Sequence, residues 1–148
     1  RPAPNTIPWD TKASGLYMIC TLSKHEAEKQ GYTDSLMLDH EGYVAEATGA
    51  NIFFKDKDGT LHTPIPDSFL DGITRRTVIE IANSMNIKVN ERKIKPDELK
   101  NFVGCFLTGT AAEVTPVSQI DKFNYKVCNT IIQLSESYQQ TVRKKKAA

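Results

Sequence analysis

The sequence predicts a mixed α/β fold of the α+β type, in a single domain. Its 148 residues are enough to bury a substantial hydrophobic core. Segments with strand periodicity and segments with helix periodicity are interleaved, but they form no regular βαβ repeat. No internal repeat or low-complexity linker divides the chain. A doubly wound parallel sheet is therefore not expected.

The chain is predicted to begin as an extended segment and to continue as a helix. Residues 1–9 contain three prolines, which restrict the backbone and remove hydrogen-bond donors. The apolar spacing that follows predicts a helix over residues 13–30, and Gly31 supplies its C-terminal stop. The inward-facing stripe of this helix is predicted to consist of Leu16, Ile19, Cys20, Ser23 and Ala27.

Four strands are predicted next, joined in pairs by turns. The tetrad at residues 39–42 is rich in turn-forming residues, and the tetrad at 56–59 ends in Asp-Gly, which supplies hairpin geometry. The segments on either side are β-branched or aromatic and are bounded by glycines, as is typical of strands. These strands are residues 35–38, 43–47, 51–55 and 60–63.

The second half of the chain alternates helices and strands. A helix is predicted over residues 73–85, a strand over 87–93, a short helix with Pro96 in its first turn at 95–99, a buried strand over 103–108, and a last helix over 127–142. The buried stripe of the helix at 73–85 is Val78, Ile81, Ala82 and Met85, and that of the last helix is Val127, Ile131, Leu134 and Tyr138.

Charge and cysteine content limit the classes of partner and the cellular compartment that the sequence predicts. The net charge is +1, from 19 basic and 18 acidic residues, so neither a nucleic-acid nor an anionic-membrane partner is expected. The basic run at 143–146 is interpreted as a solvated tail or a complement to a helix C-terminus. Cys20, Cys105 and Cys128 are odd in number and widely spaced. They predict free thiols and a cytoplasmic location, with the first two as small core residues.

Most alternative chemistries find no support in the sequence. The three histidines are scattered without metal-ligand spacing, so no metal is expected, and His40 and His62 are predicted to be solvated. The serine-hydrolase elbow, the Walker A motif and the dinucleotide fingerprint are all absent.

Glu46 is the one charged residue that the pattern places in question. It shares a strand face with Val44, because side chains alternate along a strand. If that face is buried, the carboxylate must be paired, since an isolated buried charge is very costly. A protonated ring nitrogen would serve as the partner. From the residues alone, the commoner alternative is a solvated surface acid.

Four ordered segments resemble a known family. They are residues 11–17 (Thr-Lys-Ala-Ser-Gly-Leu-Tyr), Glu46 with 49–53 (Gly-Ala-Asn-Ile-Phe), 70–75 (Leu-Asp-Gly-Ile-Thr-Arg) and 109–116 (Gly-Thr-Ala-Ala-Glu-Val-Thr-Pro). With residues 3–8 (Ala-Pro-Asn-Thr-Ile-Pro), they resemble the branched-chain amino acid aminotransferases, class IV enzymes of fold type IV. These enzymes use pyridoxal 5'-phosphate. The resemblance covers nearly the whole chain, and four blocks in the expected order are specific where one would be weak.

The resemblance carries expectations about the fold and the reaction. It implies that residues 1–148 form the C-terminal cofactor-binding domain, a pseudo-barrel of strands flanked by helices, of an enzyme whose N-terminal domain is absent from this chain. The implied enzyme is a homo-oligomer that transaminates leucine, isoleucine and valine with 2-oxoglutarate. D-amino acid aminotransferase and aminodeoxychorismate lyase share the lysine and the glutamate, and are the nearest alternatives.

Three side chains carry the implied chemistry. From the residues alone, Lys12 would be a solvated lysine and Tyr17 an aromatic of the surface or core. By resemblance, Lys12 is the Schiff-base lysine, which also moves the substrate Cα proton. Tyr17 hydrogen-bonds the phenolic oxygen of the cofactor, and Glu46 keeps its ring nitrogen protonated.

The remaining implied contacts involve backbone amides and small side chains. Residues 70–74 open a helix, and free N–H groups at a helix start can bind an anion. A plain helix capped by Asp or Thr is the commoner case for such a sequence. By resemblance, the cofactor contacts are Leu70 on the ring and Gly72, Ile73, Thr74 and Thr110 around the phosphate, and the substrate carboxylate meets the amides of Thr110 and Ala111. Asn51 has a supporting structural role.

A second class of hypothesis is a folded but inactive module. Family members take a phosphate-binding arginine and much of the substrate pocket from the upstream domain and a neighbouring subunit. On this hypothesis the chain folds but shows little or no transamination by itself.

Overall fold

The computed structural model describes residues 1–143 and contains a central five-stranded sheet. The strand order is β5-β4-β3-β6-β7, and only the β4–β5 pair is parallel. Its strands are β3 (Asn51–Lys55), β4 (Leu61–Thr63), β5 (Val89–Glu91), β6 (Gly104–Gly109) and β7 (Glu113–Pro116). Mixed strand directions and interleaved helices confirm the predicted mixed α/β class.

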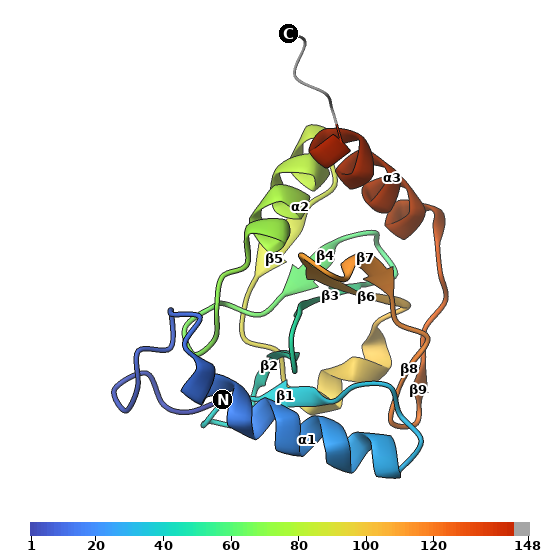
Figure 1. Ribbon diagram of the computed structural model, residues 1–148. Coiled ribbons are helices and arrows are strands. Elements are labelled where there is room, and N and C mark those ends of the chain that lie inside the picture. Colours follow the sequence, from blue (N-terminus) through green and yellow to red (C-terminus); the bar gives the residue numbers. More distant parts are fainter. Residues whose placement is uncertain (144–148) are drawn as a thin grey trace, which may run out of the picture.

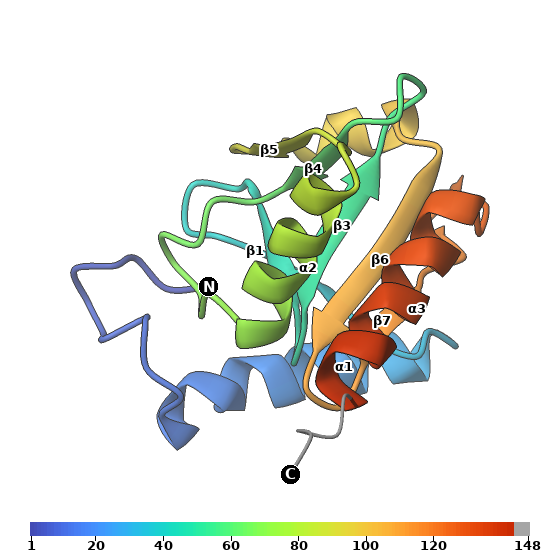
Figure 2. The same cartoon turned by 90° about the horizontal axis from the view of Figure 1, so that it is seen from above.

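Two helices cover one face of this sheet, α2 (Ile73–Ser84) and α3 (Asn129–Arg143) (Figures 1 and 2). The core between them contains the stacked rings of Phe53 and Phe106, whose centroids lie 4.9 Å apart. The helices contribute side chains from the predicted stripes, which are Val78, Ala82, Ile131, Leu134 and Tyr138. Burial of these apolar side chains is the main favourable term that holds the helices on the sheet.

A second core lies on the other face of β3 and β6. It is enclosed by the hairpin β1–β2 (Leu36–Leu38 and Val44–Ala47), the hairpin β8–β9 (Gln119–Ile120 and Phe123–Asn124) and the 3-10 helix η2 (Pro96–Asn101). All of these elements place side chains in one cluster with Phe54 and Cys105, so strands surround it as expected for a pseudo-barrel (Figure 1). Cys105 and Cys20 are buried, as predicted for small core residues, and all three thiols are free.

The N-terminal helix differs from the prediction in its first turn. Residues Ser14–Tyr17 form a 3-10 helix, η1, and the α-helix α1 spans Met18–Lys29. The change from three to 3.6 residues per turn shifts the phase of the stripe, so Leu16 and Cys20 are buried but Ile19 is 41% exposed. The predicted inward position of Ile19 is therefore wrong. Gly31, with φ of +86°, ends the helix as predicted.

Five other elements depart from the sequence prediction, which are β5, the start of α3, and β7, β8 and β9. Strand β5 is only three residues long, since its partner β4 offers only three residues for pairing. Val127 lies outside α3 and is exposed, because the neighbouring Lys126 N–H still pairs with the Val103 carbonyl along the sheet. Strands β7, β8 and β9 were not predicted.

The prediction of a solvated His62 is also wrong. Its side chain is buried, with Nε2 2.8 Å from Asp56 Oδ2 and Nδ1 accepting a hydrogen bond from Arg92 Nε at 3.0 Å. Both ring nitrogens therefore have partners, one from Asp56 at the hairpin turn and one from Arg92. His40 is exposed, as predicted. Within residues 1–143, no helix is both long and apolar enough to cross a membrane. Residues 144–146 of the basic run lie outside the described part.

Candidate active site

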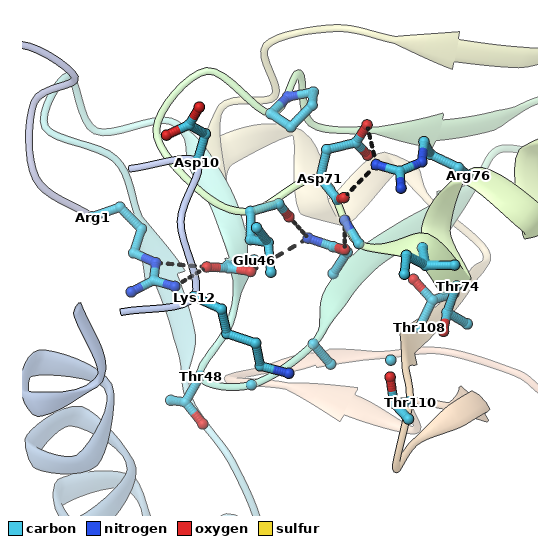
Figure 3. A pocket seen from close by; sticks show the side chains of 18 of the residues that line it. Arg1, Asp10, Lys12, Glu46, Thr48, Asp71, Thr74, Arg76, Thr108 and Thr110 are labelled. Carbon is cyan, nitrogen blue, oxygen red and sulfur yellow. Dashed lines mark hydrogen bonds and ion pairs between the residues drawn. The ribbon is translucent and has the colours of Figure 1, made fainter. Parts of the chain in front are cut away.

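A cavity of about 600 Å³ lies where the start of β3, the end of β6 and the start of α2 meet the N-terminal segment (Figure 3). Eight of the nine residues predicted for the site line it; they are Lys12, Tyr17, Glu46, Leu70, Gly72, Ile73, Thr74 and Thr110. These residues come from four segments that are far apart in the sequence. Ala111, the ninth, is exposed beyond the rim and does not line the cavity.

Lys12 enters the cavity just before η1, from an N-terminal segment that forms turns at residues 3–6 and 8–11 rather than a fully extended strand. The Lys12 side chain starts near Glu46 and points across the cavity toward Thr110 (Figure 3). The residue is exposed, and its amine makes no hydrogen bond or ion pair to any side chain or carbonyl within residues 1–143. An amine held by its backbone but not by a partner is free to react with a ligand in the cavity.

Glu46 is buried, which decides between the two alternatives drawn from its strand position. It is 4% exposed, and its partners are Arg1 and Asn51. Arg1 Nε donates to Oε1 at 2.6 Å with a second guanidinium nitrogen close by, and Asn51 Nδ2 donates to Oε2 at 3.3 Å. Burial raises the pKa of Glu46 to about 7, against the opposing effect of the Arg1 charge.

Asn51 ties the buried acid to the start of α2, a more specific role than the support expected from the sequence. Its Nδ2 also donates to the Leu70 carbonyl at 2.9 Å, and its Oδ1 accepts from the Gly72 N–H at 3.1 Å. Gly72 is close enough that a Cβ there would lie 2.4 Å from Asn51 Oδ1. The glycine is therefore required for this approach rather than for a special backbone angle, since its φ is −64°.

The start of α2 presents free amides to the cavity. No side chain of the described residues caps this helix, and Asp71 pairs instead with Arg75 Nη1 at 2.8 Å and Arg76 Nη1 at 3.4 Å. The alternative of a plain Asp- or Thr-capped helix is thereby excluded. Unpaired N–H groups and the positive end of the helix dipole favour an anionic ligand at this point.

Several lining residues were not identified from the sequence. They are Arg1, Trp9, Asp10, Thr48, Gly49, Ala50, Pro66, Asp71, Arg76, Thr108 and Gly109. Residues 49–50, Asp71 and Gly109 stand inside the recognised segments, so their position in those segments was an available signal. No local pattern marks Arg1, because its role depends on a contact 45 residues away along the chain.

A comparison with known protein families matches most of the chain, including the four recognised segments. The profile of the family described as amino-transferase class IV matches residues 3–120, a range that includes every lining residue of the cavity except Arg1. The chain belongs to the class IV aminotransferases. The family resemblance of the four sequence segments is confirmed.

Relatives of this class IV aminotransferase chain carry consistent names. It is 49% identical over 127 residues to the "Probable branched-chain-amino-acid aminotransferase" of Rickettsia bellii (strain RML369-C). The aligned region covers 86% of this chain and 44% of that relative. The chain is 43% identical over 122 residues to the "Branched-chain-amino-acid aminotransferase" of Escherichia coli (strain K12), covering 82% and 39%. The chain thus spans less than half the length of these two curated relatives.

Solved structures confirm the fold. The class IV chain superimposes on the branched-chain aminotransferase of the archaeon Thermoproteus uzoniensis with a TM-score of 0.89 and 36% identity, covering 96% of this chain and 50% of that one. A second structure, of the Thermobaculum terrenum enzyme "in PLP-form (holo-form)", gives a TM-score of 0.89 at 36% identity, with 95% and 47% covered.

Proposed function

We propose that this chain provides the cofactor-binding side of a pyridoxal-phosphate-dependent branched-chain amino acid aminotransferase. The observation that carries the proposal is a single cavity lined by Lys12, which has no partner among the described residues, and by the buried carboxylate of Glu46. The opposite wall of this cavity is the uncapped start of α2. Two similar solved structures are of branched-chain amino acid aminotransferase with pyridoxamine 5'-phosphate and with N-(5'-phosphopyridoxyl)-L-glutamate.

The residues present fit this cofactor. The free amides of Ile73 and Thr74 suit a phosphate, and Gly72 leaves room for close approach. Glu46 is a buried acid that suits a protonated ring nitrogen, and Leu70 offers an apolar side chain to the ring. When bound, the cofactor supplies the aldehyde that accepts the amino group and a ring that delocalises negative charge.

The chain's own residues then hold and move protons. Lys12 Nζ is the amine that would hold the cofactor aldehyde, and it would take the proton from the substrate Cα as a general base and deliver it to the cofactor C4′ as a general acid. Tyr17 Oη donates a hydrogen bond to the phenolic oxygen, and the Glu46 carboxylate keeps the ring nitrogen protonated. The amides of Thr110 and Ala111 would receive the substrate carboxylate; Thr110 lines the cavity, and Ala111 is the exposed residue that follows it.

The substrate class rests on the relatives. The curated relatives and solved structures quoted above are named for branched-chain amino acids, which favours leucine, isoleucine and valine over the substrates of D-amino acid aminotransferase or aminodeoxychorismate lyase. A solved complex of another similar aminotransferase with 4-methylvaleric acid, an acid with a branched apolar tail, points the same way for that protein.

The proposal includes a larger enzyme around this site. Ile73 is 75% exposed at the cavity, and Met18 and Leu22 on α1 are each 69% exposed. Large exposed apolar side chains on a site rim and a neighbouring helix suit contact with further protein. We therefore expect homo-oligomerisation of the active enzyme, and weak turnover by these 148 residues alone. A cytoplasmic location stays a prediction.

The test is covalent trapping. The chain is mixed with pyridoxal 5'-phosphate, reduced with borohydride, digested and mapped by mass spectrometry, with a Lys12→Ala variant in parallel. We expect the phosphopyridoxyl label on Lys12 and its loss in the variant. A label confined to Lys24, Lys88 or another lysine would contradict the assignment.

A further inference from the structure

A buried hydroxyl that none of the recognised segments contains faces the same cavity. Thr108, on β6, is 1% exposed and lines the cavity, yet its Oγ1 has no hydrogen-bond partner within residues 1–143. Buried hydroxyls are nearly always paired, because an unpaired one loses its hydration without compensation. The group is therefore suited to a ligand that supplies the missing acceptor.

The strand geometry explains where this hydroxyl points. Thr108 shares a face of β6 with Phe106, which belongs to the core under α2 and α3. Its cross-strand neighbours are Asn51 on β3 and Val114 on β7. The hydroxyl thus lies beneath the start of α2, on the side of the cavity where the helix amides are free (Figure 3).

Two further hydroxyls line this side of the cavity. Thr74 comes from the first turn of α2, and its Oγ1 lies 3.3 Å from Tyr138 Oη. Thr110 follows Thr108 by two residues on the loop after β6. Ser68 is the other buried side chain without a partner among the described residues, and it does not line the cavity. Within that part of the chain, a buried hydroxyl without a partner lines the ligand space only at Thr108.

We propose that the Thr108 hydroxyl donates a hydrogen bond to a phosphoryl oxygen of the bound ligand, as a third hydroxyl beside Thr74 and Thr110. This inference rests on the proposed function, which places a phosphorylated cofactor in the cavity. A hydroxyl that donates to an anion makes a stronger bond than one that pairs with a neutral group. Thr108 is thus a determinant of selectivity for the phosphorylated ligand over its dephosphorylated form.

The experiment compares two ligands that differ only in the phosphate. Dissociation constants of the full chain for pyridoxal 5'-phosphate and for pyridoxal are measured by absorbance titration in the wild type, Thr108→Val and Thr108→Ser. Pyridoxal closes to an internal hemiacetal to the same extent with every variant, so the change in the ratio of the two constants between variants isolates the phosphate contact. Unfolding of the ligand-free protein is followed in parallel by denaturant titration.

Thr63→Val is the matched control, because Thr63 is equally buried but its hydroxyl already donates to the Ile52 carbonyl at 2.8 Å. We expect Thr108→Val to weaken pyridoxal 5'-phosphate binding by about tenfold or more. It should leave pyridoxal binding and ligand-free stability unchanged or improved, and Thr108→Ser should restore the phosphate preference. Thr63→Val should lower stability without changing the preference.

Two results would overturn the inference, and they are distinguishable. If the wild-type chain takes up pyridoxal 5'-phosphate at Lys12 but Thr108→Val binds it as tightly, or loses both ligands equally, only the role of Thr108 fails. If the wild-type chain binds neither this ligand nor inorganic phosphate, the proposed function fails as well.

Discussion

At the scale of single residues, the site depends on how a buried acid is paired. Glu46 is paired with Arg1 on one oxygen and with Asn51 on the other, so both of its oxygens have partners before any ligand binds. Because Asn51 also binds the loop before α2, the acid and the anion site form one hydrogen-bonded unit. A substitution at any of these residues should therefore disturb both the buried acid and the anion site.

The Glu46→Gln substitution tests the acid. It removes the charge that would hold the cofactor ring nitrogen protonated, so turnover of the active enzyme should fall by well over tenfold, a barrier increase above about 1.4 kcal/mol. It also leaves the Arg1 guanidinium, which is 7% exposed, without its counter-charge. The double variant Glu46→Gln with Arg1→Met separates the effects, since it should recover stability but not turnover. Near-normal steady-state turnover in either variant would contradict the assignment.

The raised pKa of Glu46 predicts a pH dependence of stability in the ligand-free chain. Burial raises this pKa from 4.5 to about 7, so between these values the folded chain holds a proton that the unfolded chain has released. The free energy of unfolding should therefore fall as pH rises through this window, by at most about 1.4 kcal/mol per pH unit, and level off above it. Urea unfolding across this window and just above it measures the slope. Glu46→Gln should abolish it, and an unchanged slope in that variant would assign it elsewhere.

Gly72→Ala tests the close approach at the start of α2. The added methyl would meet Asn51 Oδ1 at 2.4 Å, so the amide must move away from Gly72, Leu70 and Glu46. We expect a loss of about 1–3 kcal/mol in stability from overpacking, together with weaker cofactor binding. Gly15→Ala is the control, because no atom lies within 4 Å of its Cβ, and its effect should stay within about 1 kcal/mol. Equal effects of the two substitutions in thermal unfolding and ligand titration would refute the argument.

At the scale of elements, α2 is held to the sheet by a buried arginine as well as by its apolar stripe. Arg75 is 1% exposed and binds Asp71 before the helix, Glu91 on β5 and the Pro64 carbonyl, at 2.8, 2.6 and 3.0 Å. One guanidinium thus connects the helix start to the end of β5 and to the segment after β4. This fixes the direction in which the free amides of α2 point.

Replacing that guanidinium should loosen the helix start. Arg75→Leu leaves the buried Pro64 carbonyl without its donor and removes the charge between two acids, so we expect a loss of about 2–4 kcal/mol. Arg76→Leu, at the next position, changes a side chain that is 52% exposed and should cost no more than about 1 kcal/mol. Urea unfolding of both variants measures the difference. Equal losses would show that Arg75 contributes no more than a surface ion pair.

At the scale of the whole molecule, two cores on opposite faces of β3 and β6 should let the described chain fold as one unit. The rings of Phe53 and Phe106 belong to one core, and those of Phe54 and Phe102 to the other. Neighbouring residues of one strand thus tie both layers together. Unfolding should therefore be a single cooperative transition.

We predict a folded chain with little transamination. Circular dichroism should show a cooperative thermal melt, while an assay with leucine, 2-oxoglutarate and excess pyridoxal 5'-phosphate should give far less turnover than an intact class IV aminotransferase. On the proposal that further protein completes the pocket, these residues alone would lack part of the substrate positioning on which the rate depends. Turnover within about tenfold of the intact enzyme would contradict the second expectation, and a spectrum without a transition would contradict the first.

Local chemistry allowed much of the fold and the site to be predicted from the sequence. Helix stripes such as Val78 and Ala82 and the Asp-Gly turn before β4 depend on neighbours within a few residues, and they were predicted correctly. The segment at residues 70–75 indicated a helix start for the same reason, whereas its assignment as an anion site came from the family resemblance. Local patterns thus determined the fold class and most elements, and the family resemblance of the sequence supplied eight lining residues of the cavity.

The tertiary structure alone decided the partners of the buried polar groups. Arg1 pairs with Glu46, which is 45 residues away in the sequence, and Arg92 donates a hydrogen bond to His62, which is 30 residues away. Thr108 lies beneath a helix from another part of the chain and finds no partner among the described residues. Similarly, the length of β5 was set by its parallel partner rather than by its own alternation. Whether a polar side chain is buried, and what it then meets, depends on how distant segments pack. A local sequence pattern carries no information about that geometry.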